Sequence, residues 1–194
     1  MVNQIKYTDD GFTIIELLIA IAIMSIIIGS MFSFSIAQRQ YFSLQEEISE
    51  MTQNTRAAMD MIAGELVMAG YSPSGAAFSG IPYSASQLQI FADLNGNGVV
   101  TDPNENIIYT YDIGNKRILR NTGGGNQPLS ENIQSFVFEY LNKQGNPTTV
   151  TANVRQIRLT ITGRTGKPDR LYATNSGYRT YTLTSLVTPR NLAY

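Results

Sequence analysis

The chain has 194 residues and a formal net charge of −1 at pH 7, so about one domain is expected and strong overall attraction to nucleic acid or anionic lipid is not implied. It contains neither cysteine nor histidine. These absences exclude disulfide frameworks, Cys/His zinc sites, thiol nucleophiles and every catalytic arrangement that needs a histidine base.

The first predicted element is an apolar segment near the N-terminus. Residues 17–37 are 21 consecutive residues without a charge or a side-chain amide. At 1.5 Å per helical residue, such a segment spans the ~30 Å hydrocarbon core of a bilayer. A secretory signal has a shorter apolar stretch, of about 7–15 residues, which a small-residue cleavage site follows. Here the helical pattern continues instead, which indicates a membrane segment.

Glu16 lies at the start of this apolar segment. A charge inside hydrocarbon costs about 2.5–3.5 kcal/mol, so an acid there needs a partner. A new α-amine at Phe12, made by cutting after Gly11, would supply one in a neighbouring subunit. The alternative is that Glu16 lies near the membrane interface and extends to water.

The sequence Gly11-Phe12-Thr-Ile-Ile-Glu16, with the apolar run behind it, resembles the type IV prepilin signature. The resemblance implies that residues 1–11 are a leader peptide, removed after Gly11 by a prepilin peptidase that also methylates Phe12. It implies that Glu16 sets the register between subunits. It further implies a single-pass precursor in lipid of the bacterial inner membrane, with a cytoplasmic N-terminus, that reaches a pilus or a periplasmic pseudopilus through an inner-membrane assembly platform.

One long helix is predicted over about residues 12–69. Its apolar residues beyond the membrane segment recur in steps of three and four, and they are Tyr41, Leu44, Ile48, Met51, Thr55, Met59, Ile62 and Leu66. Gly70 suits a helix C-cap, and Pro73 follows it. Residues 12–37 would form a transmembrane or filament-core helix, and residues 38–70 its amphipathic continuation. An ordinary coiled coil on an uncleaved membrane anchor is the alternative.

The end of this predicted helix resembles PilW-type minor pilins and the related J-type pseudopilins of type II secretion. Both carry an Asn/Ala/Arg segment and then an acid-Leu-x-x-Ala-Gly-Tyr ending, which here is residues 53–71. The resemblance implies a pilin fold and a minor pilin that packs with other pilin subunits in a pilus or its tip or priming complex. A type II secretion pseudopilin, a pilus-tip adhesin and a DNA-binding module are the alternatives.

Beyond Tyr71 the apolar period changes from about four to two, which predicts strands. Apolar residues alternate with polar ones around residues 88–92, 107–113, 136–141, 157–162 and 181–187, and Gly114-Asn115 predicts a hairpin turn into residues 116–120. About five or six strands with one apolar face favour an antiparallel sheet on the second half of the helix. The predicted fold class is therefore α+β, with a β-rich head at residues 71–194.

An acidic loop lies between the first two predicted strands. It begins with the D-x-N-x-N-G pattern and supplies five oxygen-bearing side chains, which are Asp93, Asn95, Asn97, Asp102 and Glu105. Calcium prefers several oxygen ligands, with a glycine for the sharp turn. The twelfth loop residue is Asn104, where an EF-hand has glutamate, so an EF-hand is excluded. Two hypotheses remain, a calcium loop and an Asn/Gly turn whose side chains cap their own backbone.

Charge is divided unevenly along the chain. Residues 1–141 carry 6 basic and 14 acidic side chains, whereas residues 142–194 carry 8 basic side chains and one acid, Asp169. The basic residues could bind nucleic acid. Alternatively, they keep strand edges soluble and complement acidic neighbours such as the acidic half of the next subunit. No basic run is dense, so the second interpretation is favoured and nucleic acid is not an expected partner.

No sequence motif indicates catalysis. There is no glycine-rich phosphate loop with a lysine and no nucleophile elbow, and Gly123-Gly124-Gly125 lies among Asn and Thr in a predicted loop. The protein is therefore predicted not to be an enzyme.

Overall fold

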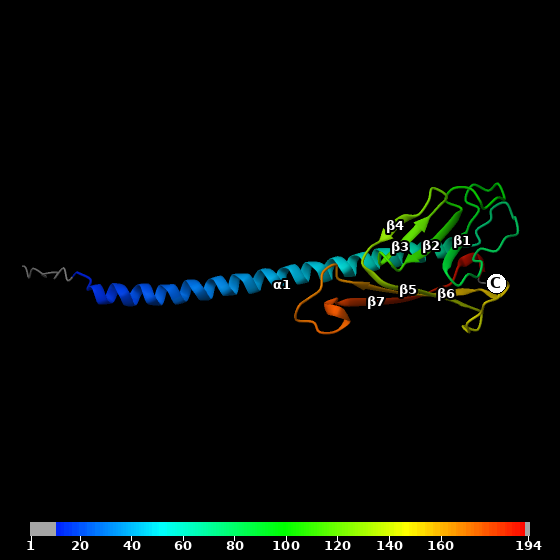
Figure 1. Ribbon diagram of the computed structural model, residues 1–194. Helices are drawn as coiled ribbons and strands as arrows, with labels where there is room; N and C mark the ends of the chain where they lie inside the picture. The colour runs from blue at the N-terminus through cyan, green and yellow to red at the C-terminus, as the bar shows by residue number, and fades with distance from the viewer. Residues whose placement is uncertain (1–10, 193–194) are drawn as a thin grey trace, which may run out of the picture. The chain divides into compact units, whose positions relative to one another are not determined.

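A computed structural model describes residues 11–192. Of the predicted leader, only Gly11 falls within this range, and residues 1–10 lie outside the described residues. The chain divides into two compact units, one ending at Gln45 and the other comprising Glu46–Tyr194. Figure 1 labels the elements, and each unit is described by itself.

The predicted long helix is confirmed as α1, which runs over Ile14–Met68 and has 55 residues. In the first unit, every described residue up to position 43 is exposed. The helix ends at Met68, and the predicted cap residue Gly70 follows with a φ of 76°, in the left-handed region that glycine adopts at low cost. In the same turn the amide of Tyr71 donates to the carbonyl oxygen of Met68 at 3.1 Å.

Within residues 11–192, seven antiparallel strands form two sheets, where a single sheet of about five or six strands was predicted. The first sheet has the order β1-β2-β3-β4 and the second β5-β6-β7 (Figure 1). Their bounds are β1 Gln87–Phe91, β2 Asn106–Asp112, β3 Arg117–Asn121, β4 Gln127–Ser130, β5 Ile133–Leu141, β6 Gln156–Arg164 and β7 Thr180–Val187. Short 3₁₀ helices lie at Thr151–Asn153, Asn175–Gly177 and Arg190–Leu192.

The two sheets separate because the chain turns sharply between β4 and β5. Asn132 has a φ of 56°, which ends one strand and redirects the next. Strand β4 escaped prediction because it has only four residues and includes Pro128, which cannot donate a ladder hydrogen bond. The α+β class with antiparallel strands is confirmed, and the arrangement is one helix with two sheets.

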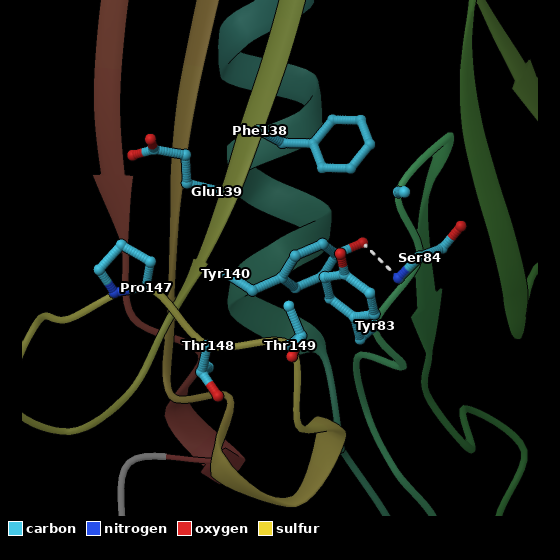
Figure 2. Close-up of a pocket in the computed structure, with 9 residues that line it drawn as sticks. Tyr83, Ser84, Phe138, Glu139, Tyr140, Pro147, Thr148 and Thr149 are labelled. Atoms are coloured by element: carbon cyan, nitrogen blue, oxygen red, sulfur yellow. Dashed lines mark hydrogen bonds between the residues drawn. The ribbon is translucent and has the colours of Figure 1, made fainter.

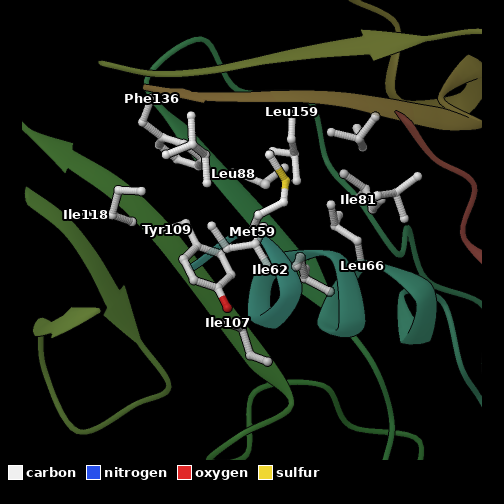
Figure 3. Packing of buried hydrophobic residues seen from close by; sticks show 14 of the residues in the cluster. Met59, Ile62, Leu66, Ile81, Leu88, Ile107, Tyr109, Ile118, Phe136 and Leu159 are labelled. Carbon is white, nitrogen blue, oxygen red and sulfur yellow. The ribbon is translucent and has the colours of Figure 1, made fainter. Parts of the chain in front are cut away.

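The core of the second unit forms where residues 46–68 of α1 meet both sheets (Figure 3). The apolar residues predicted to recur in steps of three and four form a stripe along α1, and those at Met59, Ile62 and Leu66 are buried in this core. They pack in one cluster with residues of both sheets, among them Leu88, Tyr109, Ile118, Phe136 and Leu159. The stripe is thus confirmed from Met51 to Leu66, whereas Tyr41 is exposed in the first unit.

A glycine on β6 allows this close packing. A Cβ at Gly163 would collide with Oγ1 of Thr55, which is fully buried on α1. The Thr55 hydroxyl instead donates to the carbonyl oxygen of Met51 at 2.7 Å. The period-two pattern of β6 therefore includes a position that only glycine can fill without displacing the helix.

A polar cluster of Glu65, Tyr109 and Arg120 connects α1 with β2 and β3. The Tyr109 hydroxyl donates to Oε2 of Glu65. Arg120 donates to Oε1 of Glu65 from Nη2 at 2.6 Å and from Nε at 3.0 Å. Burial, together with the nearby Glu65 carboxylate, raises the pKa of Tyr109 well above its usual range, so this hydroxyl keeps its proton.

The two sheets are also joined directly. The hydroxyl of Tyr111 on β2 shares its one hydrogen between the carbonyl oxygens of Ile133, at 2.8 Å, and Gln134, at 2.7 Å, at the start of β5. Because these bonds run from one sheet to the other, they hold the first strand of the second sheet against the first sheet.

Replacing Glu65 by alanine should destabilise the head. The change leaves the buried Tyr109 hydroxyl without its acceptor and Arg120 without its carboxylate, which should lower the free energy of unfolding by about 2–3 kcal/mol. The matched control is Asp60→Ala, at an exposed position of the same helix, for which a change within about 0.5 kcal/mol is expected. Urea unfolding of the full chain in detergent, followed by tyrosine circular dichroism, measures both. Equal losses in the two variants would contradict the prediction.

Asp112 should contribute to acid sensitivity. Hydrogen bonds from the side chain and backbone of Asn115, together with Arg117, lower its pKa from 3.8 to about 2. A lowered pKa in the folded state gives stability that is present above the ordinary pKa and is lost as the pH falls from about 4 towards 2. Asp112→Asn should therefore make the decline in the free energy of unfolding over this range shallower. Urea unfolding at several pH values tests this, and an unchanged decline would contradict it.

Candidate functional site

The start of α1 holds the residues predicted to govern processing and assembly. Thr13 caps the helix together with Glu16. The backbone amide and the hydroxyl of Thr13 each donate to Oε2 of Glu16 at 2.8 Å, and the Glu16 amide donates to the Thr13 hydroxyl at 3.3 Å. This is a capping box. The sequence analysis missed the role of Thr13, although T-x-x-E before an apolar run is a known signal for it.

The capping box leaves part of the Glu16 carboxylate available. All hydrogen bonds to this side chain from residues 11–192 reach Oε2, and within that range none reaches Oε1. Phe12 is 87% exposed, and a Cβ at Gly11 would meet no atom within 4 Å. The three residues predicted to matter for processing and register are therefore open to an external partner.

Behind the cap, α1 exposes its whole apolar segment. Every residue from 17 to 37 is exposed in the first unit. Among the residues that the structure describes, α1 holds the one helical segment long and apolar enough to cross a membrane. The methionines, phenylalanines and isoleucines of this segment have no covering partner in the described chain, so they must be covered by lipid or by other polypeptides in a stable state.

The acidic loop between β1 and β2 has two buried acids, Asp93 and Glu105. The Asp93 carboxylate accepts hydrogen bonds from the Ser74 hydroxyl at 2.6 Å, from the Gly96 amide at 2.8 Å and from the Gly98 amide at 3.0 Å. The bond from Ser74 and these amides lower the pKa of Asp93, which is therefore ionised at neutral pH.

The other predicted loop residues contact one another. Asn95 and Asn97 each donate a side-chain N–H to Oδ2 of Asp102, at 3.0 and 2.8 Å. Oε1 of Glu105 accepts the amides of Leu94 at 2.8 Å and Asn95 at 2.9 Å. The five residues thus lie in one loop. Within residues 11–192, no group of three or more acidic side chains could hold a metal ion.

Several basic side chains of residues 142–194 contact partners in their own chain. Arg158 pairs with Glu139 at 2.5 Å, Arg179 with Asp169 at 2.7 Å and Lys167 with Glu47 at 3.2 Å. Arg164 lies over the ring of Tyr178, 4.3 Å from its centroid. Half of the eight basic residues therefore contact acids or an aromatic ring of the same chain.

A pocket of the head lies beside β5 (Figure 2) and has a volume of about 410 Å³. Tyr83 and Tyr140 form its aromatic wall, with ring centroids 5.1 Å apart. The Ser84 amide donates to the Tyr140 hydroxyl at 3.3 Å. Glu139, the one acidic residue of the lining, points away from these rings and is paired with Arg158. The lining therefore holds no pair of groups suited to acid–base chemistry.

Comparisons with known proteins bear on the N-terminus and on the fold. Residues 8–32 match the family described as the prokaryotic N-terminal methylation motif. Among solved structures, the chain is similar to a type IV-like pilin from Thermus thermophilus, with 15% sequence identity and a TM-score of 0.42, over 78% of this chain and 98% of that one. No curated protein matches the chain. The chain thus carries a prokaryotic N-terminal methylation motif at the start of a long apolar helix.

Proposed function

We propose that the protein is a type IV pilin-like subunit, and specifically a minor pilin of the PilW type, that is made as a membrane-anchored precursor and packs into a pilus or its tip complex after cleavage behind Gly11. One observation carries the proposal: the methylation motif matches residues 8–32, and from Ile14 onward these residues lie on a helix whose apolar side chains are exposed on all sides. The same residues fit a single-pass precursor in the bacterial inner membrane.

The exposed helix determines what kind of partner is needed. Each large apolar side chain that leaves water contributes about 1.5–3 kcal/mol, so residues 17–37 favour an apolar environment strongly. Lipid provides it for the precursor, and the equivalent helices of other pilin subunits provide it in a filament. Helix packing, rather than chemistry at a pocket, is therefore the proposed function, with a prepilin peptidase and an inner-membrane assembly platform as transient partners.

Glu16 gives this packing its register. Its carboxylate costs free energy in an apolar surrounding, and the capping box supplies hydrogen bonds without compensating the charge. The α-amine that cleavage creates at Phe12 of a neighbouring subunit carries the missing positive charge. Two subunits are then most stable at the offset that brings this amine to Glu16.

Support for the minor-pilin assignment comes from residues 53–71. In their acid-Leu-x-x-Ala-Gly-Tyr ending, Glu65 bonds to Tyr109 and Arg120, Leu66 is buried, and Gly70 ends the helix in the left-handed region. This ending is where the helix joins the head. J-type pseudopilins share the same resemblance, so a type II secretion pseudopilus is the second candidate setting.

Co-expression with a prepilin peptidase should shorten the chain. The intact mass should fall by residues 1–11 and rise by one methyl group. Gly11→Val is the matched variant, because the added side chain has open space in the structure and should leave the fold intact. It should remain uncut. A full-length mass for the unchanged chain would contradict the proposal and favour an uncleaved membrane anchor.

Two substitutions at Glu16 should separate register from capping. Glu16→Gln keeps a side chain that can complete a capping box but removes the charge, whereas Glu16→Ala removes both. If charge pairing sets the register, both variants should be cleaved and folded yet fall at least about tenfold in filament incorporation, which corresponds to about 1.4 kcal/mol. Immunoblotting of sheared filaments measures incorporation.

The control for these variants is Glu50→Ala, at an exposed helical position beyond the apolar segment, which should be incorporated normally. Normal incorporation of Glu16→Gln alongside a defect in Glu16→Ala would show that capping alone matters. That result would remove the proposed role in register.

A further inference from the structure

We propose that the free edge of β7 is a docking site for an extended strand of a different polypeptide, which pairs antiparallel with Thr180–Val187 and lengthens the second sheet. This inference goes beyond the assembly function proposed above, because it concerns backbone hydrogen bonding at the head rather than packing of the apolar helix. Only the choice of a different polypeptide over a second copy of the chain uses the proposed membrane anchor.

The backbone of β7 has one edge that faces away from its sheet. β7 is the last strand in the order β5-β6-β7 (Figure 1). The Thr165 amide donates to the carbonyl oxygen of Arg179 at 2.9 Å, so the odd-numbered residues from here to the end of β7 face β6. Because neighbouring residues of a strand point their backbone groups in opposite directions, the even-numbered residues face away from β6. These are Thr180, Thr182, Thr184 and Leu186, and within residues 11–192 no backbone group from outside the sheet bonds to them.

The sequence of β7 lacks the features that usually keep edge strands from pairing. Protected edge strands are short, carry charges, prolines or bulges, or are covered by another segment. β7 has eight residues, TYTLTSLV, of which none is charged and none is proline. Its eight pairs with β6 run without a register shift, and the four residues that face away from β6 are all exposed. The edge is therefore regular, uncharged and open.

The two edges of the first sheet are protected. At β1, the Gly70 amide donates to the carbonyl oxygen of Phe91, and the Phe91 amide donates to that of Gly80, both at 2.8 Å. The segment that follows α1 thus covers the end of β1. β4 has only four residues, and Pro128 among them cannot donate a hydrogen bond to another strand.

The other edge of the second sheet, along β5, is closed at both ends. The Tyr111 hydroxyl occupies the carbonyl oxygens at the start of β5. Near its end, the Thr148 amide donates to the carbonyl oxygen of Tyr140 at 2.8 Å. A strand that paired along all of β5 would displace these bonds. β7 is therefore the edge at which an added strand breaks no hydrogen bond of the described chain.

The side chains of β7 indicate the chemistry of the incoming strand. On the exposed face, threonines pair across β6 and β7 in two rows, Thr160 with Thr184 and Thr162 with Thr182, with hydroxyl oxygens 3.1 and 2.9 Å apart. Hydroxyl-bearing residues on the incoming strand would extend both rows. On the opposite face Leu183 is half-buried, and an apolar residue beside it would remove more of it from water. The expected partner segment therefore alternates hydroxyl-bearing and apolar residues.

The direction of β7 argues against a second copy of the chain as the partner. At the start of the strand, Nη2 of Arg56 on α1 donates to the hydroxyl of Tyr181 at 3.3 Å. Beyond its end, Nδ2 of Asn191 donates to the carbonyl oxygen of Ala69, just after α1, at 3.3 Å. β7 therefore runs in the same direction as α1. Two copies anchored in one membrane have both helices in one direction, whereas antiparallel pairing of their β7 strands needs opposite directions.

A synthetic peptide with the sequence of residues 156–164 is the probe for this edge. These residues form β6, which already pairs antiparallel with β7 and alternates threonine with apolar residues in the required way. The peptide is labelled with fluorescein and titrated with the full chain in detergent. Fluorescence anisotropy should show saturable binding of one peptide per chain.

N-methylated forms of the peptide identify the edge that is used. When the peptide places its threonines on the same face as those of β7, the amides of Thr160 and Thr162 face the free edge, and those of Leu159 and Ile161 face away. Methyl groups on the first two amides should abolish binding. Methyl groups on the second two should leave binding unchanged, and they prevent the peptide from replacing β6. Equal binding of the two forms, or no binding of the unmodified peptide at about 1 mM, would overturn the proposal.

A proline in the full chain tests the same edge from the other side. Thr184→Pro removes an amide from the free edge and none from the ladder with β6, so peptide binding should weaken at least about tenfold. The matched control Thr184→Val keeps the amide and should bind the peptide as the unchanged chain does. Equal binding by the two variants would overturn the proposal. If Thr184→Pro lowers the unfolding temperature, the N-methylated peptides decide on the unchanged chain.

The oligomeric state of the full chain in detergent tests the choice of partner. Sedimentation without peptide should show no association that depends on β7. Self-association that Thr184→Pro abolishes and Thr184→Val retains would overturn the choice of a different polypeptide. These measurements need neither cleavage behind Gly11 nor incorporation into a filament, so their failure is distinguishable from failure of the proposed function.

Discussion

One continuous helix must satisfy two different surroundings, and the rest of the structure depends on this constraint. Between Met51 and Leu66, α1 buries a single stripe against the strands of its own chain. Over residues 17–37 it is apolar on every side and covered by nothing in the described chain. A helix that is apolar all round belongs in lipid or in the core of an assembly, whereas a striped helix belongs on the surface of a domain. The sequence changes from the first pattern to the second without a proline or another break.

The head is organised around the striped half of α1 more than around its own sheets. The two sheets do not share a hydrogen-bonded ladder, so their connection comes from the common core and the Tyr111 hydroxyl, while the Glu65 cluster holds the first sheet on α1. Glu65 is partly shielded from water, and its acceptors are used by a tyrosine from β2 and an arginine from β3. A carboxylate at the edge of an apolar stripe thereby fixes two strands at a defined height along the helix, which apolar contacts alone specify poorly.

The local spacing of apolar residues predicted most of the helix and strands, but it could not predict which distant residues pair with one another. The period change at Tyr71, the helix end at Gly70 and the inward face of β6 follow from spacing within a few residues, and the structure confirms them. The chain passes from one sheet to the other through a turn at Asn132, which has a positive φ, and the Glu65 cluster joins residues 44 and 55 positions apart. Neither has a local signature. For the loop of residues 93–105, spacing singled out the oxygen-bearing side chains, but the burial of Glu105 depends on the surrounding fold.

The capping box changes how the acid in the apolar segment should be understood. A carboxylate at the first turn of a helix is favoured by the free N–H groups and the helix dipole there, so Glu16 is stabilising in its own chain before any partner arrives. Hydrogen bonds and a partial dipole charge reduce the cost of moving the carboxylate into hydrocarbon, but they do not bring a full positive charge. The remaining cost falls on the precursor and is relieved only beside a cation. Because both capping bonds use Oε2, a cation can approach Oε1 without uncapping the helix. Stabilising the helix start and the proposed setting of register between subunits are therefore compatible demands on one side chain.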